Sequence, residues 1–213
     1  MNISPTDFAS LLCSRLCHDL LSPVGALNNG LELLADEQDP EMRQRCLELL
    51  NESARASANK LKFFRLAFGA AGGFGETVDT REAQAAIIGL FGDNHRIHIG
   101  WMVDEPVMAK QAIKVLLNLA LIAGDALIRG GQLDIGAEVV EGQVEIVVRA
   151  DGPRIVLDPE LRSALVGQGD ASITPRAAAA HLVHALVTQG GGELQVSDPD
   201  ADVLLFGAAF DVA

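Results

Sequence analysis

His18 and Asp19 are the residues of this chain whose types and spacing best fit a chemical reaction, and Pro23 follows them closely. An exposed imidazole has a pKa of about 6.5, so at neutral pH it is mostly unprotonated and keeps a ring nitrogen that can attack phosphorus. An adjacent carboxylate can orient the ring or accept its proton. Phosphoryl transfer through a phosphohistidine is therefore a chemistry that this pair could perform, with His18 as the acceptor and Asp19 as its orienting or deprotonating partner; the alternative is a surface pair without chemistry.

A long helix, expected over residues 5–35, must present His18. Its apolar residues recur at three-, four- or seven-residue spacing, which is typical of one helical face; they are Phe8, Leu12, Leu16, Leu20, Leu27, Leu31 and Leu34. Pro5 fits the first turn, where its missing N–H costs nothing. Pro23 lies inside the helix and predicts a kink or a locally opened hydrogen-bond ladder. His18 falls on the opposite, mostly small and polar face, so we expect an exposed imidazole.

The His18 face is also where a phosphoryl-bearing partner should dock. Arg15 lies one turn before His18 and can steady phosphoryl oxygens, because phosphoryl transfer depends largely on positioning and charge neutralisation. The residues expected to contact a partner are Leu11, Ser14, Arg15, Leu21, Ser22, Gly25 and Asn29, with Ala26 as a further apolar candidate. The pattern leaves open whether Leu11 and Leu21 belong to this surface or to a bundle core.

A second long helix is expected over residues 40–67, with Asp39 as its N-cap and Pro40 in its first turn. Its apolar residues are Leu47, Leu50, Ala54, Ala58, Leu61, Phe64 and Phe68, flanked by Cys46, Leu49, Ala56 and Phe63. This surface is wider than one partner helix can cover. Pairing two such hairpins into a four-helix bundle buries the excess, so we expect a homodimer formed through residues 5–68.

The chain beyond the hairpin predicts a second domain. A glycine-rich linker over residues 69–75 separates a helical domain, residues 1–70, from an α/β domain, residues 76–213. Glu141 and Gly142 predict a two-residue hairpin between two strands. The other elements are helices expected over residues 81–91, 107–129, 158–166 and 175–189, and strands over 96–103, 132–140, 143–150, 193–197 and 203–210. The expected fold class is α+β, a dimeric four-helix bundle followed by an α/β sandwich.

Composition narrows the classes of partner. A net charge of −13 and a pI near 4.7 argue against nucleic acid and anionic membranes, which need clustered lysine and arginine. No apolar run approaches the roughly 18 residues that span a bilayer, and there is no secretory signal pattern. We therefore expect a cytoplasmic protein. Cys13 and Cys17 share a helical face, but His18 lies on a different one, and two thiols with one such histidine would make a poor metal site. We therefore expect no metal and buried thiols.

Residues 1–68 resemble the dimerisation and histidine-phosphotransfer domain of histidine kinases, and residues 76–210 resemble their ATP-binding domain. Residues 118–127 are similar to the kinase N-box, which holds Mg²⁺-ATP with two asparagines four residues apart. Asn118 matches the first asparagine, and Ile122 stands where the second belongs. The resemblance implies a kinase-like fold in which the metal-nucleotide ligands are incomplete.

Two further boxes are also degenerate. Residues 151–154 resemble an Asp-x-Gly-x-Gly box, which reads adenine, but the second glycine is missing. Residues 167–170 retain only a small part of a glycine-rich lid that covers the phosphates. Such a lid needs glycines because they let backbone N–H groups approach phosphate. The resemblance therefore implies that the fold is kept, that ATP binding is lost and that this chain binds no cofactor.

Four segments carry a closer resemblance: residues 15–19 (RLCHD), 22–26 (SPVGA), 30–34 (GLELL) and 65–70 (RLAFGA). They are similar to the dimeric histidine phosphotransferases of alphaproteobacterial cell-cycle phosphorelays. The resemblance implies that His18 accepts phosphate from the receiver domain of a CckA-like hybrid histidine kinase. It would then pass the group to CtrA-like and CpdR-like response regulators, with Mg²⁺ held by the receivers. Two alternatives stay open: an ATP-dependent histidine kinase without a sensor, and a non-catalytic dimeric scaffold that binds receivers.

Overall fold

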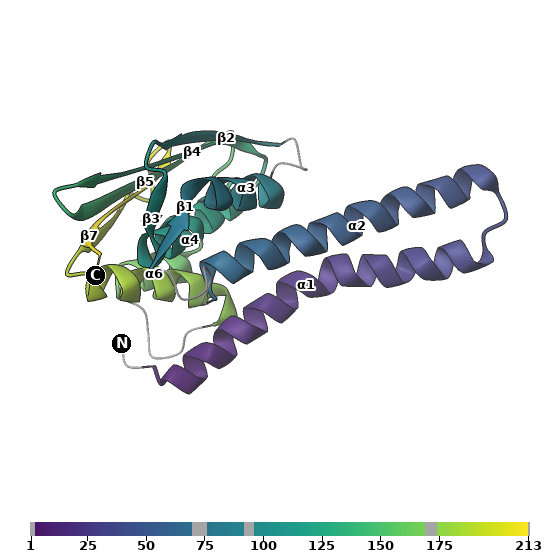
Figure 1. Ribbon diagram of the computed structural model, residues 1–213, viewed down its shortest axis with the longest axis horizontal. Helices are drawn as coiled ribbons and strands as arrows, with labels where there is room; N and C mark the ends of the chain where they lie inside the picture. Colours follow the sequence, from purple (N-terminus) through teal and green to yellow (C-terminus); the bar gives the residue numbers. More distant parts are fainter. Residues whose placement is uncertain (1–2, 70–75, 92–95, 169–173, 213) are drawn as a thin grey trace.

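The computed structural model describes residues 3–69, 76–91, 96–168 and 174–212. Figure 1 shows a long helical hairpin and an α/β part that packs at the open end of the hairpin. The predicted linker lies outside the described residues, apart from its first residue.

Helix α1 (Pro5–Asp36) and helix α2 (Pro40–Ala67) form the hairpin. The Ser4 side chain accepts a hydrogen bond from the backbone N–H of Asp7, and the Asp39 carboxylate accepts from two N–H groups of the first turn of α2. Both helix starts are therefore capped by side chains, with a proline in each first turn. The two helices predicted from the spacing of apolar residues are confirmed.

Pro23 and Gly30 shape α1 and are both buried in the hairpin. The helix continues through Pro23 and changes direction about midway along its length (Figure 1), as the predicted kink requires. Gly30 allows close approach of the two helices, because a Cβ at this position would lie only 3.0 Å from Cδ2 of Leu50.

A five-stranded sheet forms one layer of the α/β part, with the strand order β2-β4-β5-β7-β6. β2 and β4 run parallel, and the other neighbours run antiparallel. Glu141 and Gly142 join β4 to β5 with φ values of 53° and 91°, and two positive φ values are what a type I′ hairpin needs. The predicted hairpin is confirmed. The strands are β2 (Ile97–Val103), β4 (Gly131–Val140), β5 (Gln143–Asp151), β6 (Glu193–Val196) and β7 (Leu204–Asp211).

Helices form the second layer, and α3, α4 and α6 lie on the same side of the sheet in Figure 1. α4 is buried over most of its surface and so forms the centre of the layer. This arrangement confirms the predicted α+β sandwich. The helical elements are α3 (Thr80–Phe91), α4 (Lys110–Ala126), α5 (Pro159–Leu165), the 3₁₀ helix η2 (Pro175–Ala177) and α6 (Ala178–Gln189).

A small second sheet was not anticipated. Its strands β1 (Thr77–Asp79) and β3 (Val107–Ala109) pair antiparallel. The helix expected over residues 107–129 is therefore wrong at both ends, since α4 begins at Lys110 and ends at Ala126. A three-residue strand is too short to show an alternating pattern, and its partner is distant in the chain, so local spacing carries no trace of it.

The end of α2 belongs to the core of the α/β part. Phe63 and Ala67 have no exposed surface, and Phe64 stacks on Phe68 with ring centroids 5.6 Å apart. These residues join the same hydrophobic cluster as α4 and the sheet. The hairpin and the α/β part thus share one core, and the division into domains of residues 1–70 and 76–213 stays a prediction.

One stripe on each hairpin helix remains exposed although it is rich in small and apolar residues. We call these two stripes the outer stripes. They consist of Cys13, Cys17, Val24 and Leu31 on α1, and Leu47, Ala54, Ala58 and Leu61 on α2. The prediction that Cys13 and Cys17 are buried is wrong for the single chain, because they lie where α2 does not cover α1.

Candidate functional site

His18 stands on α1 with its side chain 84% exposed. Its Nδ1 lies 3.1 Å from Oδ1 of Asp19. When Nδ1 donates its proton to that carboxylate, the neutral ring must keep its lone pair on Nε2. The structure thus brings together the two residues that the sequence singled out, with the outer ring nitrogen open to solvent.

Asp19 is much less exposed, at 17%, because three neighbours hold it. One carboxylate oxygen faces His18, and the other accepts a hydrogen bond from Nε of Arg15 at 2.6 Å. The backbone carbonyl of Asp19 accepts a hydrogen bond from Nζ of Lys60 on α2 at 2.8 Å. The carboxylate therefore sits between the imidazole and a guanidinium while its backbone is tied to the second helix.

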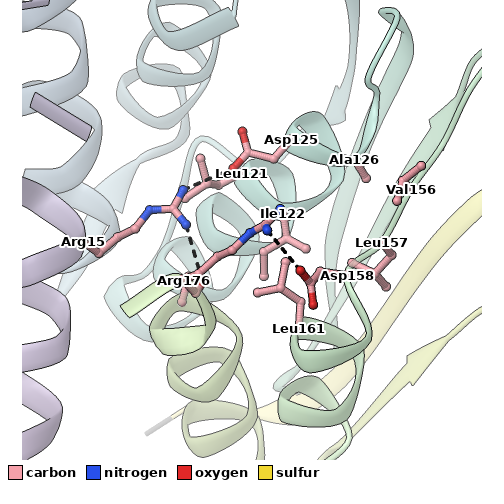
Figure 2. A pocket seen from close by; sticks show the side chains of 11 residues that line it. Arg15, Leu121, Ile122, Asp125, Ala126, Val156, Leu157, Asp158, Leu161 and Arg176 are labelled. Carbon is pink, nitrogen blue, oxygen red and sulfur yellow. Dashed lines mark hydrogen bonds and ion pairs between the residues drawn. The ribbon is translucent and has the colours of Figure 1, made fainter. Parts of the chain in front are cut away.

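Arg15 connects α1 to the α/β part. Its Nη2 lies 3.2 Å from Oδ2 of Asp125 at the end of α4, and its Nη1 donates to the carbonyl of Arg176 in η2 at 3.5 Å (Figure 2). Its side chain is only 14% exposed. Burial by itself would lower the pKa of Arg15, but the carboxylates of Asp19 and Asp125 outweigh this and raise it. Arg15 is thus a permanently charged bridge between the hairpin and the α/β part.

A cleft of about 580 Å³ opens beside His18, between α1 and the α/β part. Its walls combine residues that are more than one hundred positions apart in the sequence, so only the fold creates it. The lining residues are Ser14, Arg15, His18, Asp19, Asp125, Thr174, Pro175 and Arg176. Four of the predicted site residues therefore share one cavity with four residues of the α/β part.

Sequence reasoning missed the contribution of the α/β part to this cleft. Asp125 stood inside the segment interpreted as an N-box remnant, and nothing in its spacing pointed to α1. Arg176 belongs to a short 3₁₀ helix that had been predicted as the start of a longer helix. No local signal could have found these residues, because their link to His18 is a tertiary contact.

The remaining predicted contact residues differ in exposure and in their distance from the cleft. Leu21, at 69% exposed, and Ser22 lie on the surface, so Leu21 is not part of a core within this chain. A Cβ built on Gly25 would have no neighbour within 4 Å, so the helix surface is open there. Leu11 is half-buried. Asn29 is exposed but lines a separate hollow near the end of α1, away from the cleft at His18.

The segment interpreted as an N-box remnant is occupied by packed side chains. Asn118 is fully buried, and its Nδ2 donates to the carbonyls of Ala67 and Lys114 at 3.1 and 2.8 Å. The amide therefore serves the packing of α2 against α4, although its Oδ1 has no partner among the described residues. Ile122 is buried beside it and offers no polar group.

Figure 2 shows what fills the neighbouring space. Arg176 and Asp158 form an ion pair at 3.0 Å, and Leu121, Ile122 and Leu161 surround it. The cavity that remains has a volume of about 20 Å³, which is close to the space that one water molecule needs.

Gly152 of the adenine-box remnant has a packing role. A Cβ at this position would lie 2.5 Å from the carbonyl oxygen of Gly130. Asp151 is paired with Arg149 at 2.6 Å across the surface of β5. Both retained residues thus have structural partners. Part of the lid remnant, residues 169 and 170, lies outside the described residues.

The described residues contain neither a metal-binding cluster nor a membrane-spanning helix. No group of three or more histidine, cysteine, aspartate or glutamate side chains is placed to hold a metal ion. No described helix is long and apolar enough to cross a membrane.

Comparisons with known proteins show the family to which the chain is similar. Residues 80–202 match the family model described as histidine phosphotransferase C-terminal domain. The chain is 38% identical over 160 residues to protein phosphotransferase ChpT of Brucella abortus (strain 2308), a match that covers 75% of each chain. A solved bacterial phosphotransferase superposes with a TM-score of 0.86 and 31% identity over 98% of both chains. The Acinetobacter baumannii histidine kinase AdeS gives a TM-score of 0.47 and 17% identity, covering 91% of this chain and 97% of that one.

Proposed function

This chain belongs to the ChpT family of histidine phosphotransferases, and we propose that it relays phosphoryl groups between receiver domains through a phosphohistidine at His18. Membership of the family makes it a protein phosphotransferase of a phosphorelay. The observation that carries the assignment to His18 is its exposed imidazole, with Nδ1 3.1 Å from the Asp19 carboxylate. That arrangement directs the ring's free lone pair outward from Nε2.

In the proposed step, the lone pair of Nε2 of His18 attacks the phosphorus of an aspartyl phosphate on the partner. The P–N bond forms while the bond from phosphorus to the aspartyl oxygen breaks, and the aspartate leaves as a carboxylate. The ring gains positive charge during attack, and Asp19 stabilises that charge through Nδ1–H. Donation to the next receiver is the same step in reverse, with an aspartate oxygen as the nucleophile.

Arg15 is proposed to steady the phosphoryl oxygens. A guanidinium carries five N–H donors, and the contacts with Asp19, Asp125 and the Arg176 carbonyl engage one donor each. Donors are left for a phosphoryl group in the cleft, which Arg15 lines together with His18. A cation held in place before the phosphoryl group arrives stabilises the transition state without reorganisation.

The proposed partners are receiver domains of a CckA-like hybrid kinase and of CtrA-like and CpdR-like response regulators, as in cell-cycle phosphorelays. The exposed surface of Leu21, Ser22 and Gly25 beside His18 supports docking on α1, and the cleft supports a second contact with the α/β part. Mg²⁺ is expected in the acidic site of the receiver, and no cofactor is expected on this chain.

Dimerisation is proposed through the outer stripes. Their positions recur at four- and seven-residue spacing on α1 and at three-, four- and seven-residue spacing on α2, which suits the seam of a four-helix bundle. The thiols of Cys13 and Cys17, which are exposed in the single chain, would be buried in that seam of the dimer. Sedimentation at twice the chain mass of 22.5 kDa is the expected result, and a monomer at assay concentrations would contradict it. A cytoplasmic location is also proposed.

Loss of ATP binding is proposed from the closed N-box remnant. The buried Ile122, the ion pair of Arg176 with Asp158 and the cavity of about 20 Å³ all support it.

A two-part phosphotransfer assay tests the function. The purified protein is incubated with labelled ATP alone and, separately, with a receiver domain phosphorylated beforehand, and wild type is compared with His18→Ala. We expect label from the receiver, none from ATP and none on the variant, while receiver binding stays within about twofold because the docking surface is intact. Label from ATP would indicate a kinase, and no label from either source would leave a receiver-binding scaffold.

A further inference from the structure

Pro23 removes one hydrogen bond from α1 beside the site. In an α-helix each backbone N–H donates to the carbonyl four residues earlier, and proline has no N–H. The acceptor that loses its donor is therefore the carbonyl of Asp19, the residue whose side chain contacts His18. The proline of the motif thus leaves an unpaired carbonyl one residue after the phosphoryl-accepting histidine.

Lys60 supplies the missing donor. It lies on α2, 41 positions further along the chain, and its Nζ is 2.8 Å from the Asp19 carbonyl oxygen. The side chain is half-buried between the helices. A hydrogen bond from an ammonium is charge-assisted and stronger than one between neutral groups, so this contact ties α1 to α2 at the level of the site.

We propose that Lys60 is a positioning residue for phosphotransfer, holding the Asp19 backbone so that its carboxylate stays on Nδ1 of His18. The inference rests on the proposed role of His18 as phosphoryl carrier. It also gives Pro23 a role beyond bending the helix, since the proline creates the acceptor that Lys60 uses.

The geometry at Asp19 makes its backbone position matter. Its two carboxylate oxygens are divided between His18 at 3.1 Å and Arg15 at 2.6 Å. The contact with Arg15 is the shorter of the two and is charged, so a backbone free to shift would let the carboxylate follow Arg15 and leave His18. The hydrogen bond from Lys60 to the backbone carbonyl opposes that shift.

A double-mutant cycle of Lys60→Met and Pro23→Ala tests the proposal in the full-length protein. The measured quantities are the maximal rate and half-saturating concentration for transfer from a receiver domain phosphorylated beforehand. Lys60→Met should lower the maximal rate about tenfold, the effect of one charge-assisted hydrogen bond, with the half-saturating concentration changed less than about twofold. In the Pro23→Ala background the loss should fall below about twofold, because the N–H of residue 23 then pairs with the Asp19 carbonyl.

Two matched variants separate positioning from general effects. Lys62→Met removes an exposed lysine from the same helix and should leave the rate unchanged. Lys60→Arg keeps a cationic donor and should retain most of the activity. Nitrogen-15 NMR of the His18 ring reports the tautomer directly, and we expect Nδ1–H to dominate in wild type and both tautomers to be populated in Lys60→Met.

The outcomes are distinguishable. An equal loss from Lys60→Met in both backgrounds, or no loss in either, would overturn the proposal while leaving transfer through His18 intact. Transfer that persists in His18→Ala would instead overturn the proposed function. Thermal unfolding of each variant shows whether it is folded, and Lys60→Gln replaces Lys60→Met in the cycle if the latter does not fold.

Discussion

The surroundings of His18 and the N-box remnant differ in how much space their side chains leave open. Beside His18 the cleft has a volume of about 580 Å³, and charged side chains from α1, α4 and η2 line it. At the N-box remnant the cavity is about 20 Å³, closed by Ile122 and by an ion pair. The α4 scaffold serves both places, since Asp125 reaches the cleft while Asn118 packs against α2. One helix can therefore line an open cleft at its end and pack tightly along the rest of its length.

The same comparison shows how the α/β part reaches the proposed phosphotransfer site. The α/β part contributes no nucleophile, but Asp125 and the Arg176 carbonyl hold the Arg15 guanidinium beside Asp19. Its contribution to the site is thus one of position and electrostatics. Substitutions in the two regions should therefore have effects of different size, and the three expected effects below run from the largest to the smallest.

The largest effect is expected on the His18 side, from Asp19→Asn. The amide keeps the shape of the side chain but loses the charge that stabilises the ring during attack, so the transfer rate should fall about 100-fold, within the usual range for an acid–base partner. Rapid-quench measurement of phosphohistidine formation from a phosphorylated receiver checks it. Asp36→Asn, an exposed carboxylate at the end of the same helix, is the control. A rate within threefold of wild type would remove Asp19 from the mechanism.

A smaller effect is expected where the two regions meet, from Asp125→Asn. Asp125 is 51% exposed, and pairs with that exposure contribute little, so we expect a two- to fivefold loss of rate, or about 1 kcal/mol at most. The loss should shrink as salt is raised, since solvent ions screen the pair. Asp200→Asn, in the exposed connection between β6 and β7, should change nothing. A loss as large as that of Asp19→Asn would mean that the α/β part contributes directly to catalysis.

No gain of nucleotide binding is expected in the N-box remnant, from Ile122→Asn. This change restores the second asparagine of the box, but it leaves the ion pair of Arg176 with Asp158 and a cavity with space for about one water molecule. Calorimetric titration with Mg²⁺-ATP should therefore detect no binding in wild type or variant. Binding gained by the variant would show that the pocket is open and that only one side chain had been lost.

Much of the fold followed from local patterns. The caps at Ser4 and Asp39 are close in sequence to the N–H groups they pair with, so the starts of α1 and α2 could be predicted. The hairpin at Glu141 and Gly142 could be predicted for the same reason, since its positive φ values are a property of those two residues. The pairing of β1 with β3 could not, because its partners are about thirty residues apart and each strand has three residues.

In the site, too, contacts within one helix could be predicted from the sequence, and contacts between elements could not. Arg15 lies four positions before Asp19 on one helix, and this spacing places the two side chains on the same face. Their contact at 2.6 Å agrees with that expectation. The contact between His18 and Asp19 at 3.1 Å joins adjacent residues and depends on the rotamers that the structure shows. The expectation for Cys13 and Cys17 was wrong because helical spacing says which residues share a face but not which face the neighbouring helix covers.

The sequence by itself determined the helical hairpin, the α+β class and the position of the histidine, because these depend on residues near one another in the chain. Only the tertiary structure decided that Asp125 and Arg176 meet Arg15, that Lys60 pairs with the carbonyl left free by Pro23, and that an ion pair closes the N-box remnant. Those contacts join residues 18 to 161 positions apart. Their existence depends on how whole elements pack, and no local pattern carries that information.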